Sequence, residues 1–174
     1  MALSKNMENA LNKQVNAEIY SAYLYLSMSA DFESKNLKGF ANWMNVQAKE
    51  EMSHAMKIYN FILERSSTIT LDTIQKPKKE WKTPLEAFSD AYKHEQKVTA
   101  MINNLVDLAT KERDHATASM LQWFVDEQVE EEANAEEIVQ KLKLTKNSPQ
   151  ALFMMDKDLS ARVFVDETAK GGNE

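Results

Sequence analysis

Four long stretches of this chain place an apolar residue at every third or fourth position, which is the spacing of one face of an α-helix. They cover about residues 4–34, 38–65, 83–111 and 114–144 of the 174 residues. Only three glycines and three prolines interrupt the chain, so long helices are favoured over a fold with many strands and turns. We therefore expect an all-α protein built on four long helices.

Local signals mark where two helices begin. Thr83 is a good N-cap residue, Pro84 follows at the first helical position, and Glu86 stands where it would close a capping box. Ser148 and Pro149 repeat the pattern of a cap followed by proline. They predict a short C-terminal fifth helix that ends near residue 159.

The lengths of the connections predict how the helices are joined. The first and third connections are only a few residues long, so each should form an antiparallel hairpin. The second, residues 66–82, could span more than about 50 Å when extended, whereas a helix of about 27 residues is ~40 Å long. One long crossover between the second and third helices is therefore expected. We expect a single domain over 1–174, with a bundle over 4–144, a short helix over 149–159 and a flexible tail over 163–174.

Each of the four helices has an inward face that is apolar at both ends and polar at its centre. Helix by helix, the residues at this spacing are Met7, Leu11, Gln14, Glu18, Ala22, Tyr25, Met28 and Phe32; Phe40, Met44, Gln47, Glu51, His54, Ile58 and Ile62; Leu85, Phe88, Tyr92, Glu95, Val98, Ile102 and Leu105; and Leu121, Phe124, Gln128, Glu131, Ala135, Ile138 and Leu142. A face of this kind points inward in a bundle. Four glutamates should therefore be buried at one level.

Buried carboxylates without partners cost several kcal/mol each, on the order of the whole stability of a small domain. A pair of divalent or trivalent cations between the four glutamates would remove this cost. One such glutamate alone could be a boundary residue that reaches water, and a lone His54 could be a core histidine. The spacing of Glu51 and His54, however, places a carboxylate and an imidazole side by side on one face. The pattern on all four helices predicts a metal site.

The ligand types narrow the choice of metal and exclude several classes of site. The chain has no cysteine, which excludes disulfides, iron–sulfur clusters and thiolate sites. Carboxylates with one imidazole suit iron or manganese better than structural zinc, and better than calcium or magnesium. A net charge of −6 argues against a nucleic-acid partner. No apolar segment is long enough for a signal peptide or a membrane span, and we expect a cytoplasmic protein.

Four segments of the chain resemble prokaryotic non-haem ferritins of the ferritin-like diiron superfamily, over about residues 3–160. They are Asn16-Ala17-Glu18-Ile19-Tyr20-Ser21, Glu50-Glu51-Met52-Ser53-His54, Tyr92-Lys93-His94-Glu95-Gln96 and Leu121-Gln122-Trp123-Phe124-Val125-Asp126-Glu127-Gln128. The resemblance implies a ferritin-like four-helix bundle. It also implies ferroxidase activity, in which Fe²⁺ is oxidised to Fe³⁺ by O₂ or H₂O₂, and storage of the mineral inside a homo-oligomeric shell of 24 subunits.

The resemblance also assigns roles to residues of this chain. It implies a first iron position at Glu18, Glu51 and His54, and a second at Glu51, Glu95 and Gln128 with Glu131 nearby. A third position corresponds to Glu50, Glu127, Glu130 and Glu131, and Tyr25 corresponds to the tyrosine beside the diiron pair. From the residues alone, we interpret the acidic run that contains Glu127, Glu130 and Glu131 as a solvated helix face.

Other interpretations stay open at this stage. A diiron oxidase or peroxidase that stores no iron would share the same ligands, and a metal-free helical module would need none of them. Met52 stands where haem-binding bacterioferritins carry a methionine, but we interpret it as core packing and expect no haem. We also interpret Trp123 as core packing and expect His94, one residue off the inward face, to be exposed. The fifth helix could pack around a four-fold axis of a shell or against its own bundle.

Overall fold

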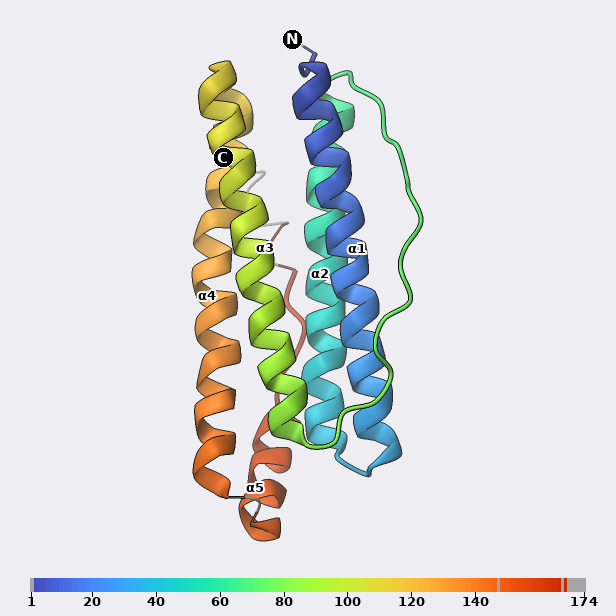
Figure 1. Cartoon of the computed structure of the whole chain (residues 1–174), viewed down its shortest axis with the longest axis vertical. Coiled ribbons are helices and arrows are strands. Elements are labelled where there is room, and N and C mark those ends of the chain that lie inside the picture. The colour runs from blue at the N-terminus through green and yellow to red at the C-terminus, as the bar shows by residue number, and fades with distance from the viewer. Residues whose placement is uncertain (1, 147, 167, 169–174) are drawn as a thin grey trace.

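The computed structural model describes residues 2–146, 148–166 and 168, and all regular structure within them is helical. Its elements in chain order are α1 (Lys5–Ser34), α2 (Lys38–Glu64), α3 (Pro84–Glu112), α4 (His115–Thr145) and α5 (Pro149–Leu159). The four long helices lie side by side along one axis, and α5 lies at one end of the bundle (Figure 1). The expected all-α bundle with a short fifth helix is confirmed, with helix ends within one or two residues of the prediction.

Four of the five helices begin with a residue whose side chain caps the helix. Ser4, Thr83, Asp114 and Ser148 each accept a hydrogen bond from a backbone N–H in the first turn. The expected capping box at α3 forms only in part. Thr83 accepts from the N–H of Glu86 at 3.1 Å, but the Glu86 carboxylate accepts from the N–H of Lys82 at 2.8 Å, one residue before the cap.

The connection between α2 and α3 runs along the outside of α1 for the length of the bundle, as expected (Figure 1). Side chains of α1 hold it at successive levels. Asn12 donates to the carbonyl of Thr68 at 2.9 Å and accepts from the N–H of Thr70 at 2.7 Å. Nearer the other end, Ser27 donates to the carbonyl of Lys78 at 2.7 Å. This path leaves α2 and α3 parallel and diagonal in the bundle.

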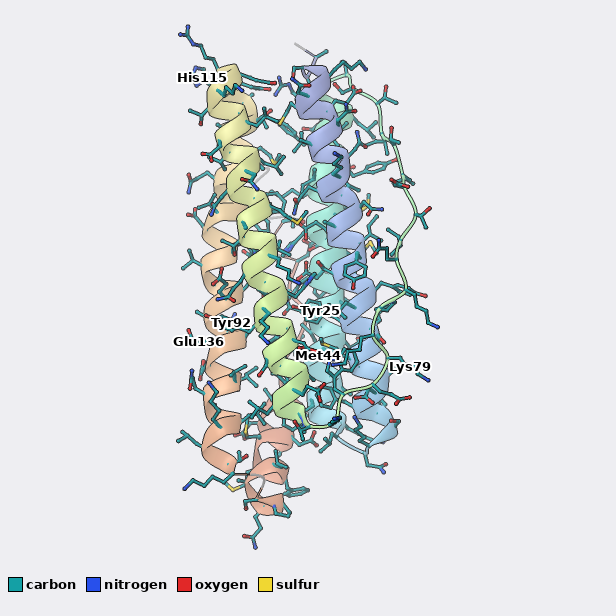
Figure 2. The ribbon with its side chains drawn as sticks, viewed as in Figure 1. Tyr25, Met44, Lys79, Tyr92, His115 and Glu136 are labelled. Carbon is teal, nitrogen blue, oxygen red and sulfur yellow. The ribbon has the colours of Figure 1, made fainter. Side chains whose placement is uncertain are left out.

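Two apolar clusters fill the bundle on either side of its centre. One gathers aromatic rings such as Phe32, Phe40 and Phe88 near the α5 end. The other is mostly aliphatic and includes Ile58 and Ile62 near the opposite end. The residues of the four predicted inward faces are all buried except Leu85 and Tyr92, which are half-buried. In Figure 2, Tyr25 and Met44 lie within the bundle, whereas Lys79 and Glu136 lie on its outside.

α5 packs against its own bundle through one side. Leu152, Met155 and Leu159 contact the aromatic cluster. The Asp156 carboxylate accepts hydrogen bonds from the first N–H groups of α2, at 2.8 Å from Gly39. A Cβ on Gly39 would lie 1.5 Å from the Asp156 carbonyl oxygen, so only glycine permits this close approach.

The other side of α5 is open. Phe153 and Met154 are 72% and 67% exposed. Docking on the bundle and an exposed apolar side therefore coexist in the single chain.

The chain continues beyond α5 along α2. Phe164, Asp166 and Thr168 line a groove together with residues of α2 such as Met56 and Asn60. The flexibility expected for residues 163–174 stays a prediction, and residues 167 and 169–174 of that range lie outside the described part of the chain. Within the described residues, no helix is both long enough and apolar enough to cross a membrane.

Candidate metal centre

The four glutamates predicted to meet do meet, at the middle of the bundle. Glu18, Glu51, Glu95 and Glu131 come from α1, α2, α3 and α4, and each is at most 4% exposed. They lie together because each occupies the inward face of its helix at mid-length, between the two apolar clusters. The bundle therefore places four carboxyl groups where solvent cannot screen them.

Glu18, Glu51 and His54 form the first group that could bind a cation. One ligand atom from each lies within 4.8 Å of the others, and all three side chains are buried. The His54 Nδ1 atom is 3.7 Å from Glu51 Oε2, as expected for neighbours one turn apart on α2. Gln14, one turn before Glu18 on α1, donates to Glu18 Oε1 at 2.7 Å and so orients that carboxyl group.

Gln47 links the carboxyl groups of two helices. Its Nε2 atom donates to Glu51 Oε1 at 3.0 Å and to Glu131 Oε2 at 2.7 Å. Because Gln47 is completely buried, these bonds are shielded from water. Gln47 lies on the predicted inward face, but its helical spacing does not indicate that it would join α2 to α4 in this way.

The Glu95 carboxyl group is contacted by side chains of two other helices. The Tyr25 hydroxyl of α1 donates to Glu95 Oε1 in a short hydrogen bond. Gln128 of α4 approaches Glu95 Oε2 at 3.3 Å through Nε2, and the same nitrogen is 3.2 Å from the Thr99 hydroxyl. Tyr25 and Gln128 therefore hold Glu95 toward the other carboxyl groups, and Thr99 is a supporting residue that the sequence pattern did not single out.

Burial dominates the electrostatics of this layer. Burial, followed by the charge of a neighbouring glutamate, raises the pKa of Glu18, Glu51 and Glu131 to about 8. The same two causes raise the pKa of Glu95 well above its usual range. Burial and the charge of Glu95 raise the pKa of the Tyr25 hydroxyl as well. The carboxyl groups therefore retain protons at neutral pH in the metal-free protein, and bound cations would release them.

Two buried oxygens among the described residues lack a hydrogen-bond partner. They are Glu18 Oε2 and Gln47 Oε1. Such groups are rare in folded proteins and costly, and a cation beside Glu18 would satisfy the first. The oxygen-rich set with one imidazole fits iron or manganese.

A second group lies beside the first, toward the outside of α2 and α4. Ligand atoms of His54, Glu127 and Glu131 lie within 4.8 Å of one another, and His54 Nε2 is 3.8 Å from Glu127 Oε1. Of the other two residues assigned to a third position, Glu50 forms an ion pair at 2.5 Å with Arg162. Glu130 is exposed and does not join either group.

The structure tests the interpretation of three further residues near the centre. Met52 is 43% exposed and lines the groove along α2, so its interpretation as core packing is wrong, because it lies one residue past the inward face. His94 is half-buried and within 2.7 Å of the Ser21 hydroxyl, not exposed, because the adjacent face of α1 covers it. Trp123 packs edge-on against His54 at 5.4 Å between ring centroids, in agreement with a packing role.

Comparisons with known proteins agree with this fold. The family model of the ferritin-like domain matches residues 8–145. The bacterial non-heme ferritin of Bacteroides fragilis (strain 638R) is 42% identical over 160 residues, which are 92% of this chain and 99% of the relative. That of Staphylococcus aureus (strain USA300) is 41% identical over 165 residues, 95% of this chain and 99% of the relative. The open pore ferritin of Archaeoglobus fulgidus, a solved structure, is 52% identical with a TM-score of 0.92, over 93% of this chain and 100% of that one.

Proposed function

This chain belongs to the ferritin family, and we propose from that membership and from its buried carboxyl groups that it oxidises ferrous iron and stores the ferric product. The observation that carries the proposal is the meeting of four glutamates and one histidine from four helices in a layer shielded from water. A helical bundle with an apolar core is stable without a buried layer of carboxyl groups. Its electrostatic cost is offset when cations bind.

Each iron position in the proposal uses residues described above. Glu18, Glu51 and His54 bind one ferrous ion, and Glu51, Glu95 and Gln128 bind the second with Glu131 close by. Glu51 is the shared residue because its carboxyl group interacts with both Glu131 and Glu18. Anionic oxygen ligands favour Fe³⁺ over Fe²⁺, so the carboxylates promote the loss of one electron from each ion.

The electrons and protons of this oxidation balance in either of two ways. Dioxygen takes two electrons and two protons and leaves as hydrogen peroxide, or hydrogen peroxide takes them and leaves as two water molecules. The carboxyl groups supply protons, since those with a raised pKa release them when a cation binds. Tyr25 orients Glu95 through its hydroxyl and lies close enough to serve as a hydrogen-bond donor during the reaction.

Storage requires a cavity that a single bundle lacks. We propose that copies of the chain assemble into a hollow shell of 24 subunits, in which the exposed side of α5 with Phe153 and Met154 contacts other copies. Ferric product then passes from the diiron centre by way of Glu50, Glu127 and Glu130 to the interior. The proposal places this protein in the cytoplasm, without a nucleic-acid or membrane partner.

Iron loading tests the proposal directly. Metal-free protein would receive several hundred Fe²⁺ per assembly in air, followed by size-exclusion chromatography with iron measured in every fraction. Bulk iron that elutes with a large assembly is the expected result. Two irons per subunit with the excess precipitated would instead identify a diiron oxidase or peroxidase that stores no iron, and no bound iron would leave a helical module without metal.

A further inference from the structure

The segment that follows α5 is anchored along α2 by specific contacts. Asn42, in the first turns of α2, donates from its side-chain amide to the carbonyl oxygens of Leu159, Ser160 and Arg162, at 3.0 Å for the last. Together with the Asp156 cap described above, these bonds fix the place where the chain leaves α5. They direct the side chain of Arg162 toward the middle of α2.

Arg162 is held by three separate interactions. Its guanidinium stacks on the Trp43 ring at 4.3 Å and donates to the Trp43 carbonyl at 3.3 Å. It also donates to Glu50 Oε2 at 2.5 Å. The side chains of Arg162 and Glu50 are only 21% and 19% exposed. Exposed ion pairs contribute little, but a shielded guanidinium that is stacked and paired at the same time is a well-defined contact.

This arginine stands beside the iron-binding layer. Glu50 directly precedes Glu51, the residue proposed to bridge the two irons. The carboxyl group of Glu131 lies within electrostatic range of both Glu50 and Arg162, which act on it with opposite signs. Among the described residues, Arg162 therefore places a positive charge beside Glu50, on the proposed route by which a cation would leave the centre.

We propose that Arg162 is a positioning residue that competes with iron for Glu50, and so controls when a third cation can occupy the Glu50, Glu127 and Glu131 side of the centre. The inference rests on the proposed function. A cation that binds to Glu50 through Oε2 must displace the guanidinium that donates to this oxygen. Arg162 thereby weakens the third position relative to the first two, and the segment over residues 160–166 moves when that position fills.

Zinc binding to the metal-free, full-length protein tests this competition without relying on oxidation. Zn²⁺ would be titrated by calorimetry into the wild type and into Arg162→Gln. We expect the first two zinc ions to bind each subunit equally in both, and the third to bind at least about fivefold more tightly to the variant, the size of a typical coupling between sites. Equal affinity for the third zinc in both proteins would overturn the inference.

Three further variants make the result specific. Lys49→Gln removes one positive charge from an exposed residue next to Glu50 and should leave the third affinity unchanged. Arg162→Met removes the charge but keeps an unbranched side chain on Trp43, and should reproduce Arg162→Gln if that variant folds poorly. Adding Glu50→Gln to Arg162→Gln should abolish the gain in affinity for the third zinc ion. A gain that also occurs in Lys49→Gln, or that survives without Glu50, would contradict competition for this carboxylate.

Binding is reciprocal, so the third zinc should also loosen the segment. Hydrogen exchange of the backbone over residues 159–166 should become faster in the wild type only when zinc exceeds two per subunit. Unchanged exchange at three zinc ions per subunit would count against the proposal. Failure of the proposed function is distinguishable, because the wild type would then not bind the first two zinc ions stoichiometrically.

Discussion

The polar layer at the centre of the bundle and the apolar clusters on either side of it are built on the same four helix faces but by opposite means. In the clusters, side chains such as Phe88 and Ile62 are buried against one another and need no partner beyond close packing. In the layer, Glu18, Glu51 and Glu131 are buried equally well but carry carboxyl groups whose pKa burial raises to about 8. Burial therefore stabilises the fold at the ends and opposes it at the centre.

The difference shows where the stability and the chemistry of this protein reside. Amide and hydroxyl groups of Gln14, Gln47 and Tyr25 satisfy some of the carboxyl oxygens, but they do not remove the cost of burying four carboxyl groups. The clusters supply the free energy that keeps the layer assembled while no cation is bound. We expect substitutions in the clusters to change the free energy of unfolding, and substitutions in the layer to change the rate of ferrous oxidation.

The largest effect on stability is expected in the aliphatic cluster. Ile62→Ala removes a fully buried side chain two turns from His54 on α2 and should lower the free energy of unfolding by about 2–5 kcal/mol through lost burial and a cavity. The rate of ferrous oxidation per folded subunit should stay within about twofold, since the site is distant. Urea unfolding and stopped-flow oxidation would be measured on the same samples. A large loss of oxidation at unchanged stability would refute the division between the two regions.

In the layer, Glu51→Gln should slow oxidation without lowering the stability of the fold. The substitution keeps the shape of the side chain but removes the charge that the two proposed iron positions would share, and oxidation should slow by about 100-fold or more. The metal-free variant should be at least as stable as the wild type, because a buried carboxyl group is replaced by a neutral amide. The control is Glu137→Gln, which changes an exposed carboxylate of α4 that is paired only with solvent-exposed Lys141 in the described structure. Normal oxidation by Glu51→Gln would remove this glutamate from the proposed site.

The stability of the metal-free protein should depend on pH through the same carboxyl groups. Their folded-state pKa lies near 8, above the unfolded value of 4.5, so their favourable contribution is complete below pH 4.5 and is lost as pH rises through 8. Each proton released on unfolding changes stability by about 1.4 kcal/mol per pH unit. His94, whose pKa burial lowers to about 4, acts in the opposite direction, but only below about pH 6.5.

Thermal unfolding between pH 6.5 and pH 8 therefore isolates the layer. The melting temperature of the metal-free protein should fall across this range, and the fall should be smaller in Glu18→Gln. Saturating Zn²⁺ should flatten it further, because bound cations keep the carboxylates charged in the folded state. A melting temperature that rises from pH 6.5 to pH 8 would contradict the assignment of protonated carboxyl groups to the centre.

The smallest effect is expected at the edge of the layer. Tyr25→Phe keeps the buried ring and removes only the hydroxyl that donates to Glu95. Oxidation should slow by about 10-fold or less, at the lower end of what an outer contact to a metal ligand contributes. Stopped-flow measurement beside Tyr23→Phe, an exposed tyrosine of the same helix, provides the comparison. A loss as large as that of Glu51→Gln would mean that Tyr25 takes part in the reaction itself.

Much of this architecture follows from local features of the sequence. Helical periodicity is a property of consecutive residues, so it located the four long helices, their inward faces and the level at which Glu18, Glu51, Glu95 and Glu131 are buried. The length of the connection over residues 66–82 was enough to predict the crossover. These predictions are confirmed because a helix face that is apolar at both ends is buried in the interior of a bundle.

Other features depend on contacts between segments that are distant in the sequence, and only the tertiary structure decided them. Gln47 joins Glu51 to Glu131 because α2 and α4 are neighbours, and Arg162 reaches Glu50 because the chain turns back along α2 after α5. Periodicity reports which way a side chain points from its own helix. It does not report which groups of another element that side chain meets, and at this centre those partners determine the charge and orientation of the proposed ligands.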